Sequence, residues 1–214
     1  MTKRKNVDDV TSNIPGSEGQ SRKYGMSTLA VHAGARPDPV TGARGTPIYQ
    51  TTSFVFDDAE HGAELFNLQT FGYVYSRMTN PTVSVFEERV AQLEGGRGAV
   101  ATSSGHAAQF IAAATLMEAG DEFIASRNLY GGSVTQFGVS FPKLGWKCNF
   151  VDPTDPANFE KAMNDKVKFI FCEGVANPGG IILDLEKIAD IAHKHGVLLI
   201  VDNTLASPYL LRPF

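Results

Sequence analysis

The sequence has little of what membrane, secreted and nucleic-acid-binding proteins usually carry. It has only two cysteines, Cys148 and Cys172, whose spacing does not match a metal site, so we expect reduced thiols in a cytoplasmic protein. No apolar run approaches the roughly 20 residues that a membrane helix needs, and no hydrophobic stretch follows the basic N-terminus to make a signal peptide. The formal net charge of −4 favours neither nucleic acid nor a membrane as a partner.

The overall composition is ordinary for a globular protein of 214 residues, with 43% hydrophobic and 20% charged residues. The residue types are, however, distributed unevenly along the chain. Residues 1–25 have few large apolar side chains, and we expect a disordered tail. Residues 26–68 are rich in glycine, proline and threonine without a regular pattern, which indicates an N-terminal arm that lies on another surface, such as a second subunit. Residues 69–214 have regular periodicity and form the predicted main domain.

Strands and helices are expected to alternate through this main domain. A helix should begin after Asn80, which can cap it, and end at Gly95. The predicted strands that follow cover residues 98–104, 121–126, 147–152, 166–173 and 197–203, and the predicted helices cover residues 105–120, 131–145, 156–165 and 183–196. Strands that are apolar throughout and alternate with helices predict an α/β fold, a three-layer, mostly parallel sheet with helices on both faces.

Polar residues directly follow several of these predicted strands. Ligands of parallel sheets bind beyond the carboxyl ends of the strands, so these residues are candidates for a site. They are Ser104, Gly105, His106, Tyr130, Glu173, Asn177, Asp202 and Thr204. Together they offer hydroxyls, amides, an aromatic ring and two acids, which suits a flat, polar, phosphorylated ligand.

The turn from Ser104 to His106 leads into a predicted helix through small residues. A helix N-terminus offers unpaired N–H groups and the positive end of a dipole, so this turn is a candidate phosphate site. It is neither a GxGxxG fingerprint nor a P-loop. A tight strand–helix turn without a ligand is the alternative.

Asp202 ends an unbroken apolar run, where a carboxylate needs a partner such as a positively charged ring nitrogen. Tyr130 stands beside two glycines and could stack on a planar ligand and move a proton through its hydroxyl. In "YSRMTNPT", Arg77 lies two residues after Tyr75 and suits a phosphate, which could belong to a neighbouring subunit. The alternatives are a turn or helix-capping aspartate, a core or surface tyrosine and a solvated arginine.

These segments resemble the Cys/Met-metabolism family of pyridoxal-phosphate enzymes, the γ-subfamily of fold type I. The resemblance spans residues from about Leu29 to Phe214 and is carried by "YSRMTNPT", "SSGHAAQ", "NLYGGS", "EGVANP" and "VDNTLASPYLLRPF". It implies pyridoxal 5′-phosphate as the cofactor. It also implies that residues 69–214 are the large cofactor-binding domain of that fold, incomplete at its C-terminus.

The family pattern implies roles for the candidates that follow the strands. Gly105 and His106, preceded by Ser104, would give backbone amides to the cofactor phosphate. Tyr130 would stack on the pyridine ring and assist proton transfer. Asp202 would pair with the pyridine nitrogen.

The same pattern implies roles for the remaining candidates. Tyr75 and Arg77 would reach the phosphate in the partner subunit. Glu173 and Asn177 would face the substrate, with Asn177 also near the 3-oxygen of the cofactor, and Thr204 would lie beside the cofactor.

The activity implied by the resemblance is γ-replacement on O-acetylhomoserine, in which sulfide or a thiol replaces acetate and gives homocysteine or methionine. "LAVHAG", "GHAAQF" and "FPKLGWKCNFVD" favour this branch, and Gly132 stands where methionine γ-lyases typically carry a cysteine. Cystathionine γ-synthase, cystathionine γ-lyase and methionine γ-lyase are the alternatives within the family. A nucleotide-binding α/β module without catalysis is an alternative from another class.

Members of the family hold the cofactor as a Schiff base on a lysine in a Ser-x-Thr-Lys segment beyond the Asp202 position, and no lysine of this chain has that context. We therefore expect a second polypeptide that carries the C-terminal part and completes the enzyme. An inactive fragment and a non-catalytic cofactor-binding module are the alternatives. The family and the arm together imply a homotetramer of catalytic dimers.

Overall fold

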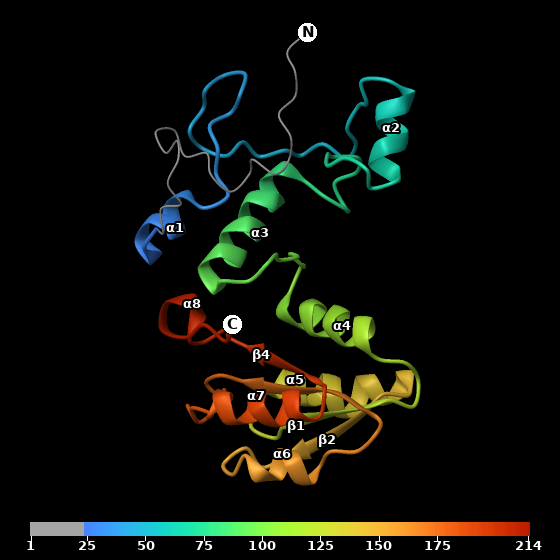
Figure 1. Ribbon diagram of the computed structural model, residues 1–214, viewed down its shortest axis with the longest axis vertical. Helices are drawn as coiled ribbons and strands as arrows, with labels where there is room; N and C mark the ends of the chain where they lie inside the picture. Colours follow the sequence, from blue (N-terminus) through green and yellow to red (C-terminus); the bar gives the residue numbers. More distant parts are fainter. Residues whose placement is uncertain (1–23) are drawn as a thin grey trace. The chain divides into compact units, whose positions relative to one another are not determined.

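A computed structural model describes residues 24–214, which form two compact units divided between Ala101 and Thr102 (Figure 1). The predicted tail lies outside the described residues except for residues 24 and 25. The predicted division at residue 68 between an arm and a large domain stays a prediction.

The first unit contains three helices: α1 (Met26–His32), α2 (Ala59–Phe66) and α3 (Pro81–Glu94). The predicted signals for α3 are confirmed, because the Asn80 side chain accepts the Thr82 N–H at 2.9 Å and Gly95 ends the helix with a positive φ of 78°. The irregular composition of residues 26–68 gave no expectation of α1 or α2.

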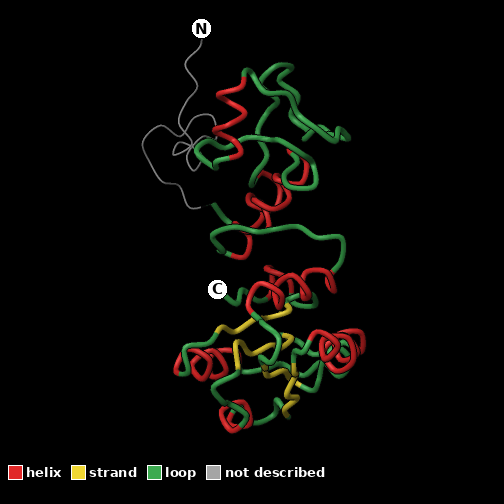
Figure 2. Tube along the Cα trace, turned by 90° about the vertical axis from the view of Figure 1, so that its right-hand side faces the viewer, coloured by secondary structure: helices red, strands yellow, loops and turns green. Residues whose placement is uncertain are grey.

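The second unit is built on a parallel sheet with the strand order β2-β1-β3-β4, drawn in yellow in Figure 2. Its strands are β1 (Glu122–Ser126), β2 (Lys147–Val151), β3 (Val167–Glu173) and β4 (Leu198–Asp202). Its helices are α4 (Gly105–Leu116), α5 (Gly131–Thr135), the π-helical η2 (Gln136–Ser140), the 3-10 helix η3 (Phe141–Leu144), α6 (Ala157–Lys161), α7 (Leu185–Lys194) and α8 (Ser207–Leu210). The prediction of a parallel α/β fold is confirmed.

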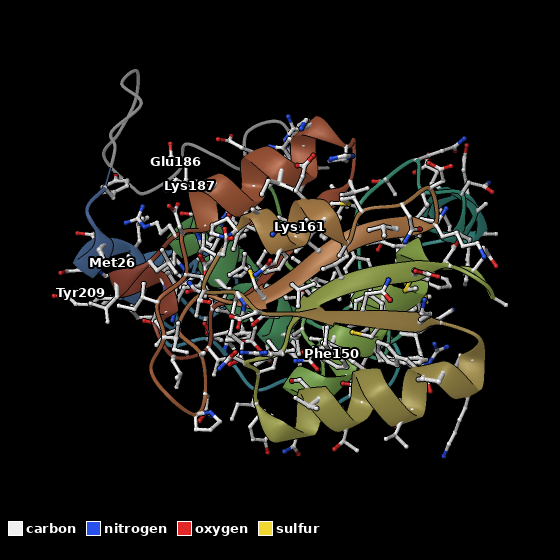
Figure 3. The ribbon with its side chains drawn as sticks, turned by 90° about the horizontal axis from the view of Figure 1, so that it is seen from below. Met26, Phe150, Lys161, Glu186, Lys187 and Tyr209 are labelled. Carbon is white, nitrogen blue, oxygen red and sulfur yellow. The ribbon has the colours of Figure 1, made fainter. Side chains whose placement is uncertain are left out.

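Alternation along the strands sends side chains to two separate cores. Phe123 of β1 and Phe169 of β3 stack at 4.7 Å between ring centroids, on the face covered by α4 and the continuous segment α5–η2–η3. Ile124 and Ile170 point to the other face, where Ile188 of α7 meets them together with α6. Figure 3, with Lys161 labelled on α6 and Glu186 and Lys187 on α7, shows helices on both sides of the sheet, so the three-layer prediction is confirmed.

The predicted strand over residues 98–104 is wrong in this structure. These residues pair with no strand in the described part of the chain, and Val100 is 81% exposed. A strand is stable only when a neighbour accepts and donates its backbone hydrogen bonds, so an apolar sequence alone does not produce one.

The cysteines are free, with Cys172 buried and Cys148 half-buried. Burial raises the pKa of the Cys172 thiol to about 12 and also raises that of Cys148, so both stay protonated. Over residues 24–214, no helix is long and apolar enough to cross a membrane, and no cluster of side chains suits a metal ion.

Candidate functional site

A cavity of about 300 Å³ lies at the carboxyl end of the sheet in the second unit. It is lined by Ser104, Gly105, His106, Gln109, Tyr130, Glu173, Val175, Asn177, Asp202, Thr204 and Leu205. All the predicted site residues of this unit are among them, brought together from α4, the start of α5, the loop after β3 and the tip of β4. This is where a parallel sheet binds its ligands.

A second cavity of about 330 Å³ lies beside the phenylalanine core. Its walls are Phe137, Gly138, Pro142, Gly145, Trp146, Lys147 and Cys148. Because none of these is an acid or an amide side chain, we place the candidate site in the cavity at the carboxyl end of the sheet.

The N-terminus of α4 forms the anion-binding side of this cavity. Ser104 caps the helix, and its Oγ accepts the N–H of Ala107 at 3.1 Å. The N–H groups of Gly105 and His106 stand too early in the helix to have an acceptor within it. Together with the helix dipole, these two amides suit a phosphate group.

Asp202 supplies negative charge at the same cavity and is half-buried at the tip of β4. Its Oδ1 accepts the backbone N–H of Thr204 at 3.0 Å and also the Thr204 hydroxyl. Among the described residues, its Oδ2 accepts only a long hydrogen bond, 3.4 Å, from Nε2 of Gln109. The carboxylate is thus held in place through one oxygen, while the other retains capacity for a positively charged donor.

Tyr130 presents an aromatic ring to the cavity, with the side chain 52% exposed. The ring of His106 lies beside it, with centroids 5.8 Å apart and planes tilted by 31°. Both rings pack over Gly132, where an added Cβ would come within 2.5 Å of the His106 ring and 2.6 Å of the Tyr130 ring. Glycine at this position therefore lets the two rings meet.

Glu173 lies at the tip of β3, in register with Asp202 on β4, and is only 4% exposed. Its Oε1 accepts the backbone N–H of Tyr130 at 2.6 Å, and its Oε2 accepts the backbone N–H of Asn177 at 2.8 Å. Burial raises the pKa of this carboxyl group, against the lowering effect of the two N–H groups, and the charge of Asp202 raises it further.

Gln109 is a site residue that the sequence reasoning missed. Its Nε2 donates to Ser133 Oγ at 2.9 Å as well as to Asp202, and its Oε1 is buried without a partner within the described residues. The available signal was a single amide side chain in a helix made mostly of small and apolar residues, one turn after Gly105.

Tyr75 and Arg77 belong to the first unit. The Arg77 guanidinium lies over the Tyr75 ring, with Cζ 5.4 Å from the ring centroid. The loop is held to residues 51–53, since Ser76 N–H donates to Thr52 O at 2.8 Å. Both side chains are exposed, and their predicted contact with a partner subunit's phosphate stays a prediction.

The donor set of the cavity fits pyridoxal phosphate. Amides and a helix dipole at Gly105 and His106 suit the phosphate, the Tyr130 ring suits stacking, and Asp202 suits a protonated ring nitrogen. The negatively charged phosphate would thus meet N–H donors, and the positively charged ring nitrogen would meet a carboxylate.

Comparison with known proteins points the same way. The Cys/Met metabolism PLP-dependent enzyme family matches residues 27–214. The chain is 48% identical to O-acetyl-L-homoserine sulfhydrylase from Leptospira meyeri, with 93% of this chain and 45% of the relative covered, and 48% identical to homocysteine synthase from Schizosaccharomyces pombe, with 88% and 44% covered. The chain spans about half the length of the curated relatives that it matches.

A solved structure shares this fold. It is a protein from Campylobacter jejuni, named as an O-acetylhomoserine (thiol)-lyase, that carries N'-pyridoxyl-lysine-5'-monophosphate. It superposes with a TM-score of 0.87 at 38% identity, with 90% of this chain and 47% of that chain covered. The chain belongs to the Cys/Met metabolism family of PLP-dependent enzymes.

Proposed function

We propose that the chain is the cofactor-binding part of an enzyme that carries out γ-replacement on O-acetylhomoserine, with sulfide or a thiol as the incoming group and homocysteine or methionine as the product. The observation that carries this proposal is the meeting of the α4 N-terminus and Asp202 at one cavity. The proposal is supported by relatives at 48% identity named O-acetyl-L-homoserine sulfhydrylase and homocysteine synthase.

Each residue of the cavity has a defined task in this proposal. The backbone amides of Gly105 and His106 bind the phosphate, and Ser104 keeps them directed at it by capping the helix. Asp202 keeps the pyridine nitrogen protonated. When bound there, pyridoxal phosphate supplies an electron sink that stabilises negative charge at the α-carbon of the amino acid.

The remaining residues orient the ligands and move a proton. Tyr130 covers the pyridine ring with its own ring and exchanges a proton through its hydroxyl. Asn177 faces the substrate and the 3-oxygen, and Thr204 holds Asp202 in its orientation. Tyr75 and Arg77 bind the phosphate of the partner subunit.

In this proposal the lysine for the cofactor aldehyde lies in the part of the relatives that the matched residues do not cover. The complete form is a homotetramer of catalytic dimers in the cytoplasm. Mass spectrometry of the purified native protein tests this arrangement. An assembly of four copies supports it, and a stable monomer in active enzyme contradicts it.

Cystathionine γ-synthase, cystathionine γ-lyase and methionine γ-lyase share the cofactor and are the competing activities. A cysteine like that of methionine γ-lyases would bring its Cβ at position 132 within 2.5 Å of the His106 ring and 2.6 Å of the Tyr130 ring, so both rings would have to move. The packing around Gly132 therefore favours replacement with an external nucleophile over a lyase of that kind.

Two experiments test the proposal. The 214-residue chain should bind pyridoxine 5′-phosphate, which has the ring and the phosphate but needs no lysine, in isothermal titration calorimetry; binding of nucleotides alone would favour the non-catalytic module instead. The completed enzyme should then use O-acetylhomoserine faster than O-succinylhomoserine, and sulfide faster than cysteine. Preference for O-succinylhomoserine with cysteine would assign it as a cystathionine γ-synthase.

A further inference from the structure

Glu173 is the most deeply buried acid of the candidate site. It is 4% exposed, and within the described residues no lysine, arginine or histidine forms an ion pair with it. Desolvation of an unpaired carboxylate is costly, so a group kept in this position must be offset by good hydrogen bonds. The two backbone N–H groups of Tyr130 and Asn177 provide them, at 2.6 and 2.8 Å.

The two hydrogen bonds join different parts of the chain. Tyr130 immediately precedes α5 and is separated from Glu173 by 43 positions, whereas Asn177 belongs to the loop that follows β3. Both residues line the cavity, and Glu173 itself is fixed in the sheet by its pairing with β4. The Glu173 carboxylate therefore connects two walls of the cavity to the carboxyl end of the sheet, where Asp202 also lies.

We infer that Glu173 is a positioning residue that clamps the Tyr130 loop and the Asn177 loop to the tip of β3. This role is additional to the direct substrate contact that the family resemblance implied, because the two hydrogen bonds to backbone N–H groups are formed without any ligand. The clamp fixes the Tyr130 ring and the Asn177 side chain relative to Asp202. The effect of the clamp on cofactor binding rests on the proposed function, whereas the two hydrogen bonds that form the clamp do not depend on it.

Only a carboxylate at the right distance satisfies both loops. In Glu173→Gln, one of the two acceptors becomes an NH₂ group that faces a backbone N–H, so one hydrogen bond is lost and a donor is left unsatisfied. In Glu173→Asp, the charge remains, but the side chain is one methylene shorter and cannot reach both amides. Glu173→Gln thus tests the loss of a hydrogen-bond acceptor, and Glu173→Asp tests the shortening of the side chain.

Amide hydrogen exchange by NMR on the 214-residue chain tests the clamp without any ligand. In the wild type, the Tyr130 and Asn177 amides should be protected, and in each variant the exchange of at least one of the two should become about 10-fold faster, as the loss of one hydrogen bond worth about 1.4 kcal/mol allows. The amide of Phe171 inside β3 should not change. Tyr130 and Asn177 amides that exchange as fast as exposed loops in the wild type would overturn the inference even where a variant fails to fold.

Calorimetry with pyridoxine 5′-phosphate tests the positioning role. The affinity should fall about 10-fold in both variants. The matched control is Glu122→Gln, which alters a half-buried acid at the opposite end of the sheet and should leave the affinity unchanged. Equal losses of affinity in the variants and the control would mean that Glu173 is only structural. If the wild type binds no ligand but the amides respond as expected, the proposed function fails and the clamp stands.

Discussion

The two ends of the sheet in the second unit each carry an acid, half-buried Glu122 and buried Glu173, and the surroundings of the two acids shift their pKa values in opposite directions. Glu122 begins β1, where Asn149 Nδ2 donates to its carboxylate at 2.7 Å and Lys147 Nζ approaches at 3.2 Å. These side chains, Asn149 first, lower the pKa of Glu122 to about 2. Glu173 ends β3 with no cationic side chain paired to it in residues 24–214, and burial raises its pKa.

This difference shows which end of the sheet is built for stability and which for binding. At the amino end, the side chains of Asn149 and Lys147 donate hydrogen bonds to the charged carboxylate of Glu122. At the carboxyl end, Glu173, Asp202 and the helix cap Ser104 accept hydrogen bonds from backbone N–H groups around the cavity. Asp202 lies next to Glu173 on the neighbouring strand. An acid with a raised pKa in a cavity, such as Glu173, is typical of functional sites, where such arrangements are kept although they cost stability.

The largest effect on binding is expected from Asp202→Asn. A hydrogen bond to a charged group contributes about 1.5–3 kcal/mol, so the affinity for pyridoxine 5′-phosphate should fall about 10- to 100-fold in calorimetry. The matched change at the amino end is Asp121→Asn, which weakens an ion pair with Lys168 at 3.4 Å and should leave the affinity unchanged. Wild-type affinity in Asp202→Asn would contradict the assignment of Asp202 to the ring nitrogen.

Glu122→Gln should act on stability alone. At neutral pH the free energy of unfolding should fall by about 1.5–3 kcal/mol in urea denaturation, since charge-assisted hydrogen bonds are lost. The folded pKa lies below the unfolded value, so the contribution of Glu122 is complete above pH 4.5 and is lost as the pH falls toward about 2. The variant should therefore converge on the wild type in that range. A constant difference at all pH values would contradict this origin of the stabilisation.

The alternation of apolar strands and helices was enough to predict the parallel sheet and its two covered faces, because residues of β1 and β3 must bury both sides. It failed at residues 98–104, since the hydrogen-bonding partner of a strand is a property of the whole sheet and not of the segment. It also gave no expectation of α1 and α2, because their amphipathic pattern is short.

The cavity could be predicted because the candidates of the second unit stand at the end of a strand, in the loop after it or at a helix start, and topology brings those points together. The hydrogen bonds of Glu173 could not be predicted, since the sequence does not show that the N–H groups of Tyr130 and Asn177 point at one carboxylate. Gln109 was missed for a similar reason: its approach to Asp202 joins residues 93 positions apart.

The pH dependence of Glu173 should have the opposite sign to that of Glu122. Its folded pKa is raised above the usual 4.5, so its contribution to stability is complete below that pH and declines as the pH rises through the folded pKa. The free energy of unfolding of the wild type, relative to Glu173→Gln, should therefore decrease with rising pH above 4.5. Parallel pH profiles of the two proteins would show that Glu173 is not desolvated as the structure indicates.

The smallest effect is expected where an amide side chain donates to an acid at each end. Gln109→Met removes the 3.4 Å contact with Asp202 and the 2.9 Å bond to Ser133 while keeping the side-chain volume, so the affinity for pyridoxine 5′-phosphate should fall about 2- to 10-fold, as neutral hydrogen bonds contribute about 0.5–1.5 kcal/mol. Asn149→Leu removes the corresponding donor to Glu122 and should lower stability without changing the affinity. If both variants lose affinity equally, Gln109 does not orient Asp202, and the two ends of the sheet are less distinct than their hydrogen bonds indicate.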